Sequence, residues 1–152
     1  LQSRSTISYA VFCLKKKTAS ARIKSKKVMD RLFEKGTGLW QSPFRMVFTT
    51  IPYNEEQPVR VGVSAPKRKM KKAVDRNRMK RLMREAFRLN KQPILDYCRQ
   101  HQVGLAILFI SQCNTLVSFR KTEDKIIILL RRLTTENAPT AKLTDDRNDQ
   151  VL

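Results

Sequence analysis

The alternation of apolar and polar residues in the first half of the chain predicts one helix followed by two strands. From Ser25, a suitable N-cap, apolar residues recur at helical spacing as far as Gly36, which ends the helix. Residues 44–51 are rich in β-branched and aromatic side chains, and residues 59–63 alternate valines with polar or small neighbours, so both segments are predicted to be strands. The polar turn at 52–58 lies between these strands and therefore predicts a hairpin.

The second half of the chain predicts a helix, a central strand and a last helix. The first of these helices covers residues 73–89 and is ended by Asn90 and Pro93. Residues 103–110 are almost uniformly apolar, which is typical of a strand covered on both faces. Ser118 suits the N-cap of the last helix, although three consecutive isoleucines within that helix would suit a strand equally. The apolar stripe of this helix consists of Ile126, Leu129, Leu130 and Leu133.

These elements indicate one α+β domain with a segment on either side. Residues 1–24 have no clear period and are expected to form a basic arm, and residues 25–133 form the domain. Residues 134–152 are polar and weakly acidic and are expected to be disordered. The connection at 36–42 is expected to be flexible. The order helix, strand, strand, helix, strand, helix predicts a two-layer α/β sandwich, in which the helices pack on one small sheet.

Composition narrows the possible functions. The 152 residues carry 32 Lys and Arg against 13 Asp and Glu, a formal net charge of +19, while 41% of the residues are hydrophobic and can build a core. Such a charge repels itself unless a polyanion neutralises it, so nucleic acid or an anionic membrane surface is the expected partner. The longest apolar run, residues 103–110, is too short to cross a bilayer, and no signal-peptide core is visible. We therefore expect a cytoplasmic protein that does not span a membrane.

The positive charge is concentrated in residues 60–91, which contain thirteen Lys and Arg against Asp75 and Glu85. On a helical wheel, one face of the 73–89 helix is apolar and is expected to pack on the sheet. A charged face can simply be solvated, but it then usually carries acids at i,i+4 spacing. We favour a polyanion-binding face, and the preference for Arg over Lys favours shaped recognition of RNA phosphates over attraction to a membrane. This face collects Asn77, Arg78, Lys80, Arg81, Arg84 and Arg88.

Several motifs in this region resemble the protein component of bacterial ribonuclease P. They are the run Arg60-Val-Gly-Val-Ser64, the pair Lys67-Arg68, and the pattern Ala-Val-x-Arg-Asn-Arg-x-Lys-Arg-x-x-Arg-Glu that starts at Ala73. The Arg-Asn-Arg signature within this pattern is highly specific. The resemblance extends over about residues 12–133 and includes the run Leu32-Phe33-Glu34-Lys35-Gly36 on the first helix.

The resemblance implies a subunit of a ribonucleoprotein endoribonuclease that removes the 5′ leader from precursor transfer RNA. The RNA subunit and Mg²⁺ would carry out the hydrolysis, so no catalytic or metal-binding residue is expected in this chain, which would join the holoenzyme as a monomer. The resemblance also implies a left-handed crossover between the second and third strands, against the general right-handed preference. Contacts to the RNA subunit are then expected from Lys67, Arg68, Lys72, Arg76, Asn77, Arg78, Lys80, Arg81, Arg84 and Arg88.

A cleft between the sheet and a helix takes the single-stranded leader in this family. Aromatic side chains suit such a cleft because they stack on bases of any sequence. The candidates for its lining are Phe33, Phe44 and Phe48, with Phe12 from the arm, and each of them could instead be an ordinary core residue. At two positions where family members often carry an aromatic residue, this chain has Met29 and Val47.

Two other functions are compatible with parts of the sequence. A self-sufficient nuclease would need carboxylates or histidines gathered around a metal or a water, and the acids are scattered along the chain. Cys98, His101 and Cys113 could supply three zinc ligands, but a structural site needs a fourth, so buried, reduced cysteines are expected instead. The remaining alternative is a ribosomal or chaperone-type RNA-binding protein without a role in cleavage.

Overall fold

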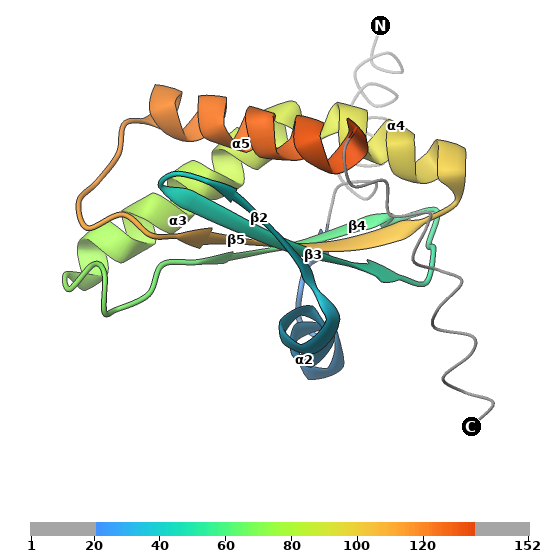
Figure 1. Cartoon of the computed structure of the whole chain (residues 1–152), viewed down its shortest axis with the longest axis horizontal. Helices are drawn as coiled ribbons and strands as arrows, with labels where there is room; N and C mark the ends of the chain where they lie inside the picture. Colours follow the sequence, from blue (N-terminus) through green and yellow to red (C-terminus); the bar gives the residue numbers. More distant parts are fainter. Residues whose placement is uncertain (1–20, 136–152) are drawn as a thin grey trace, which may run out of the picture.

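The computed structural model describes residues 21–135, and this part of the chain contains four helices and a five-stranded sheet (Figure 1). The predicted positions Phe12 and Cys13, most of the arm, and all but two residues of the predicted tail lie outside the described residues. The elements are β1 (Ala21–Arg22), α2 (Lys26–Lys35), β2 (Thr37–Gln41), β3 (Phe44–Ile51), β4 (Val59–Ser64), α3 (Ala73–Asn90), α4 (Gln92–His101), β5 (Gly104–Ser111) and α5 (Phe119–Thr135).

The strands are arranged in the order β1-β4-β5-β3-β2, with β5 in the centre. β5 pairs in parallel with β4 and antiparallel with β3, so the predicted hairpin between β3 and β4 is wrong. The almost uniformly apolar β5 takes the central position of the sheet, where helices cover both its faces and strands pair with both its edges. It therefore separates β3 from β4. β3 instead forms a hairpin with β2, through a turn at Ser42 and Pro43, so residues 36–42 are not the flexible connection that we expected.

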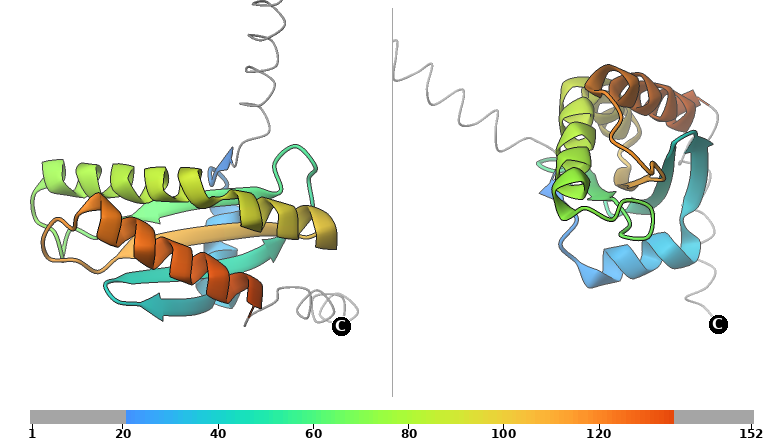
Figure 2. Two further views of the ribbon diagram at one scale, coloured as in Figure 1. Left: turned by 90° about the horizontal axis from the view of Figure 1, so that it is seen from above. Right: turned by 90° about the vertical axis from the view of Figure 1, so that its left-hand side faces the viewer.

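The connection from β4 to β5 is a left-handed crossover. β4 and β5 are adjacent and parallel, and the chain between them runs through α3 and α4 on one face of the sheet. Seen from that face (Figure 2, left), with the strands pointing upward, β5 lies to the left of β4, which is the hand opposite to the usual one. The left-handed crossover and the α+β class are therefore confirmed.

The helices cover the sheet unequally. α3, α4 and α5 lie on one face, and α2 lies on the other, where it crosses the strands (Figures 1 and 2). The larger core cluster fills the space beneath α3, α4 and α5, and the smaller one joins Leu32 of α2 to Val47, Ala106 and Leu108 of the sheet. The helices thus do not form a single layer, and the sheet face around α2 is only partly covered by a helix.

α4 was not expected from the sequence, because Pro93 was taken as the end of α3. In the structure Pro93 stands in the first turn of α4, where a missing N–H costs nothing and a fixed φ favours the helix. The last helix is confirmed over the alternative strand: the Ser118 carbonyl accepts the first helical hydrogen bond, from Thr122, and the predicted stripe is buried. None of the helices within residues 21–135 is long and apolar enough to cross a membrane.

Candidate nucleic acid interface

The orientation of α3 is fixed by its apolar face. Met79, Met83 and Ala86 are fully buried, and the ring of Phe87 lies against that of Phe109 on β5, with 5.9 Å between the centroids. Because this face packs on the sheet, the opposite face of the rigid helix is held toward solvent. Five of the predicted RNA-binding side chains on α3 are exposed and Lys80 is half-buried; the exposed ones are Asn77, Arg78, Arg81, Arg84 and Arg88.

Arg22 on β1 lies beside this face, and no pattern in the sequence indicated that it would. Partial burial lowers the pKa of Arg84, and the positive charges of Arg22 and Arg81 lower it further, so the three guanidinium groups are near enough to repel one another. Arg22 is held there because the next residue anchors the edge strand: the Ile23 N–H donates to the Val61 carbonyl over 3.2 Å. Arg22 and Arg84 are far apart in the chain, so no periodic pattern could show that their side chains are near each other. The pairing of β1 with β4 brings them together.

Arg88 differs from the other cations of α3 because it already has an acidic partner. Its Nε and Nη2 donate to the two carboxylate oxygens of Glu85 over 2.9 and 2.6 Å. This hydrogen bonding raises the pKa of Arg88 and lowers the pKa of Glu85. An RNA phosphate would have to compete with Glu85 for this guanidinium, so we expect Arg88 to contribute less than Arg81 and Arg84.

The Arg76 side chain points back toward the loop that precedes α3. Its Nη1 donates to the carbonyl of Met70 over 3.0 Å and to the carbonyl of Lys71 over 2.6 Å. Both carbonyls belong to the loop of residues 65–72, which joins β4 to α3 and also carries three predicted RNA-binding residues. These three, Lys67, Arg68 and Lys72, are exposed.

The predicted lining of the leader cleft is only partly supported by the structure. Phe44 and Phe48 are 0% and 3% exposed and belong to the core beneath α3, α4 and α5, so they do not line an open cleft. Successive side chains of a strand point to opposite faces, and these two share the face that points away from α2. Phe33 on α2 is 68% exposed and remains a candidate, whereas Phe12 lies outside the described residues.

The side chains of these strands that point to the α2 side of the sheet include candidates that were not predicted from the sequence. Arg45 on β3 pairs with Trp40 on β2 and with Ile110 on β5, so all three project from the sheet face on which α2 packs. Trp40 is 53% exposed and Arg45 is exposed as well. The signal that could have found Arg45 is the period of two along residues 44–51, because it separates Arg45 from the buried Phe44 and Phe48.

α2 directs Phe33 toward this surface. Leu32 points into the sheet, and α2 runs across the strands from the β1 edge to the β2 edge (Figure 2, right). In a right-handed helix the next residue is turned by about 100°, which places Phe33 on the flank of α2 that looks toward Arg45 and Trp40. Met29 lies on the same flank and is partly buried against the smaller core cluster. We call Phe33, Trp40 and Arg45 the α2-side surface.

The zinc alternative finds no support in the arrangement of its residues. Within residues 21–135 there is no group of three or more His, Cys, Asp and Glu side chains that could hold a metal ion. Cys98 is fully buried, and this burial raises the pKa of its thiol to about 12, so it remains protonated at neutral pH. His101 is exposed and lies against the ring of Tyr97, with 4.4 Å between the centroids.

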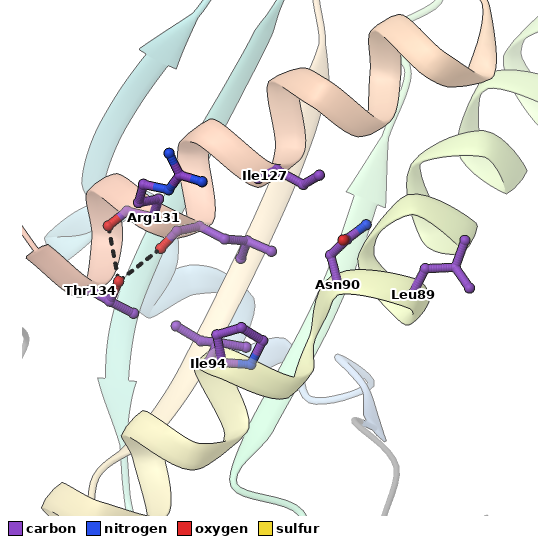
Figure 3. A pocket seen from close by; sticks show the side chains of 8 residues that line it. Leu89, Asn90, Ile94, Ile127, Arg131 and Thr134 are labelled. Carbon is purple, nitrogen blue, oxygen red and sulfur yellow. Dashed lines mark hydrogen bonds between the residues drawn. The ribbon is translucent and has the colours of Figure 1, made fainter.

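A separate cavity of about 260 Å³ lies where the α3–α4 junction faces α5 (Figure 3). Its lining is mainly apolar, and the Asn90 side chain bridges its wall by donating to the Ala86 carbonyl and to Glu123 Oε1 over 2.9 and 3.0 Å. None of the predicted RNA-binding or leader-binding residues lines it. The lining residues are Leu89, Asn90, Pro93, Ile94, Ile127, Leu130, Arg131 and Thr134.

The sequence of this chain matches those of known proteins. The family model named Ribonuclease P matches residues 18–134 of this chain. A ribonuclease P protein component from Porphyromonas gingivalis is 31% identical over 84% of this chain and 92% of its own length. The chain belongs to the ribonuclease P protein family. Another relative in that family, the protein component from Chlorobaculum tepidum, is 32% identical over 80% of this chain and 85% of its own length.

Solved ribonuclease P proteins share the fold described above. The Staphylococcus aureus protein superposes with a TM-score of 0.56 at 24% identity, covering 74% of this chain and 94% of its own. The Thermotoga maritima protein gives a TM-score of 0.53 at 24% identity, covering 75% of this chain and 96% of its own. As a member of the ribonuclease P protein family, this chain is part of a ribonuclease P holoenzyme.

Proposed function

We propose that this chain, as the ribonuclease P protein subunit, binds the folded catalytic RNA through the exposed face of α3. The observation that carries the proposal is the cationic face of α3, on which Arg78, Arg81 and Arg84 are exposed side by side and free of the packing that holds the opposite face on the sheet. Arg22 of β1 adds a further positive charge beside Arg84. Like charges held together are unfavourable in the free protein, and a phosphate backbone would relieve that repulsion. A rigid helix also presents its guanidinium groups at fixed spacing, which suits recognition of shaped RNA rather than of a fluid surface.

The α2-side surface is proposed to bind the 5′ leader of precursor transfer RNA. Phe33 and Trp40 are 68% and 53% exposed, so their rings are available to stack on bases. Arg45 stands between the strand positions of Trp40 and Ile110, and its guanidinium lies over Gly38. This exposed side chain can meet a leader phosphate. Stacking and a single charge tolerate any base sequence, which is what a leader of variable sequence requires.

The hydrolysis itself is assigned to the RNA subunit and its Mg²⁺ ions. Within residues 21–135 no three His, Cys, Asp or Glu side chains come together in a way that could hold a metal ion, which is compatible with Mg²⁺ bound by the RNA. The side chains of this protein would bind and orient RNA, and one copy would act with each RNA subunit. We expect the protein to act in the cytoplasm, together with its precursor transfer RNA.

A cleavage assay tests this function. Adding the chain to the matching catalytic RNA at low Mg²⁺ is expected to accelerate leader removal from precursor transfer RNA by at least about tenfold, because its positive charge replaces counterions that the RNA complex would otherwise need. The protein alone should cut nothing. If the RNA binds the protein but cleaves no faster, the alternative of a ribosomal or chaperone-type RNA-binding protein is favoured instead.

Phe33→Ala tests the leader site. The binding of precursor transfer RNA to the holoenzyme is expected to become weaker by about 1–3 kcal/mol, the free energy of stacking one base. The binding of mature transfer RNA should stay unchanged. Equilibrium binding of both RNAs to wild type and variant measures this difference. Phe33 is 68% exposed, so its removal should alter the free energy of unfolding by no more than about 0.5 kcal/mol. An equal loss of affinity for both RNAs would show that Phe33 does not touch the leader.

A further inference from the structure

The loop of residues 65–72 is held in one conformation by several backbone contacts. The Pro66 carbonyl accepts the N–H groups of Lys69 and Met70 over 3.2 and 3.1 Å, which closes a tight turn. The Met70 side chain is only 3% exposed and is part of the larger core cluster. These contacts fix the middle of the loop, while Lys67 and Arg68 on its outer side remain exposed.

The end of the loop has no side-chain cap of the usual kind. Lys72 stands at the N-cap of α3 and makes no side-chain hydrogen bond to the first turn, and no Ser, Thr, Asp or Asn takes its place. The two hydrogen bonds from Arg76 Nη1 to the Met70 and Lys71 carbonyls therefore tie the incoming chain to the first turns of α3. A hydrogen bond donated by a charged group is stronger than one between neutral groups, so this tie is a firm one.

We infer that Arg76, the first residue of the Arg-Asn-Arg motif, is a positioning residue: it locks the 65–72 loop onto α3 and so holds Lys67 and Arg68 beside the exposed face of that helix. The neighbouring arginine of the motif, Arg78, is exposed and is available to phosphates directly. The two arginines of one motif would thus act differently, one through the loop and one through its own charge. The part of this inference that concerns RNA rests on the proposed function.

The test compares two variants of α3, Arg76→Gln and Arg78→Gln. Each removes one positive charge from the helix, so Arg78→Gln is the matched control. Amide hydrogen exchange is measured in the free protein at Lys69 and Met70, whose N–H groups donate to the Pro66 carbonyl. We expect exchange in Arg76→Gln to be at least about tenfold faster than in wild type, because the tie to α3 is lost, and exchange in Arg78→Gln to stay within about twofold. Unchanged exchange in Arg76→Gln, with the helix otherwise folded, would overturn the inference.

A third variant, Arg76→Lys, separates charge from geometry. Lysine keeps the charge but replaces the planar guanidinium by a point charge on a flexible stem, so it should hold the loop less well than arginine. Affinity for the catalytic RNA is expected to follow loop exchange across the Arg76 variants and not their charge. If Arg76→Lys binds RNA as tightly as wild type while its loop exchanges as fast as in Arg76→Gln, then Arg76 acts by charge alone and the inference is wrong.

The two measurements also keep this inference apart from the proposed function. Exchange in the free protein needs no RNA, so it reports on the tie between Arg76 and the loop in every case. A wild-type protein that fails to bind the catalytic RNA would contradict the proposed function, whereas an unprotected wild-type loop would contradict the role of Arg76.

Discussion

The double variant Arg81→Ala with Arg84→Ala is expected to bind the catalytic RNA at least about tenfold more weakly at 0.15 M salt, because two charge-assisted contacts are lost. The slope of log affinity against log salt should become less steep by about 2, one for each phosphate contact removed. Both guanidinium groups project from the exposed face of α3, so the helix should remain folded. Filter binding or fluorescence anisotropy over a salt series measures both quantities.

A matched control removes the same charge from another part of the surface. Arg99 on α4 and Arg120 on α5 are exposed arginines outside the candidate interface, and replacing both by alanine lowers the net charge equally. If the interface is correctly placed, this control pair leaves the salt slope nearly unchanged. Equal changes in the two double variants would mean that RNA responds only to the net charge of the protein, and the α3 interface would then be abandoned.

Phe109→Ala is expected to lower the free energy of unfolding by about 3–5 kcal/mol, the usual cost of removing a fully buried phenylalanine. Phe109 is 0% exposed in the central strand, and its ring lies against Phe87 on the apolar face of α3. Its loss therefore opens a cavity directly beneath the helix that carries the basic face. Thermal unfolding followed by circular dichroism should show a midpoint lower by roughly 10–20 °C.

Phe33→Ala is the internal comparison for this variant, since it removes the same side chain from an exposed position. We expect the two substitutions to have opposite profiles: Phe109→Ala should reduce stability, while Phe33→Ala should reduce leader binding and leave stability unchanged. A stability loss below about 1 kcal/mol in Phe109→Ala would be inconsistent with the packing described for the core.

The local elements could be read from the sequence where one period dominated. The limits of α2, α3 and β5 were close to those observed, because each has a clear apolar face or run and suitable end residues. β2 was missed because its five residues, Thr37–Gln41, are mostly exposed or half-buried and carry a weak pattern. α4 was missed because a proline that begins a helix looks, in sequence, like a proline that ends one.

The candidate site was likewise predicted in part, where one helix carries the pattern, and missed where several strands build the surface. The cations of α3 were found because five of them recur on one side of a single helix, which is a property of the sequence alone. The leader surface was assigned by residue type, and two of the described phenylalanines chosen for it, Phe44 and Phe48, are buried core residues. The strand period that separates them from Arg45 was present in the sequence, but the face that would be buried could not be known before the helices were placed.

By itself the sequence determined the secondary structure of the long, periodic segments, the basic face of α3 and the partner class that such a charge requires. These follow from side-chain spacing and charge, which act over a few residues. Only the tertiary structure decided that β5 separates β3 from β4, that Arg22 lies beside Arg84, and that Trp40 and Arg45 share a face with α2. Such contacts join residues distant in the chain, and their free energy depends on burial and pairing that no local pattern records.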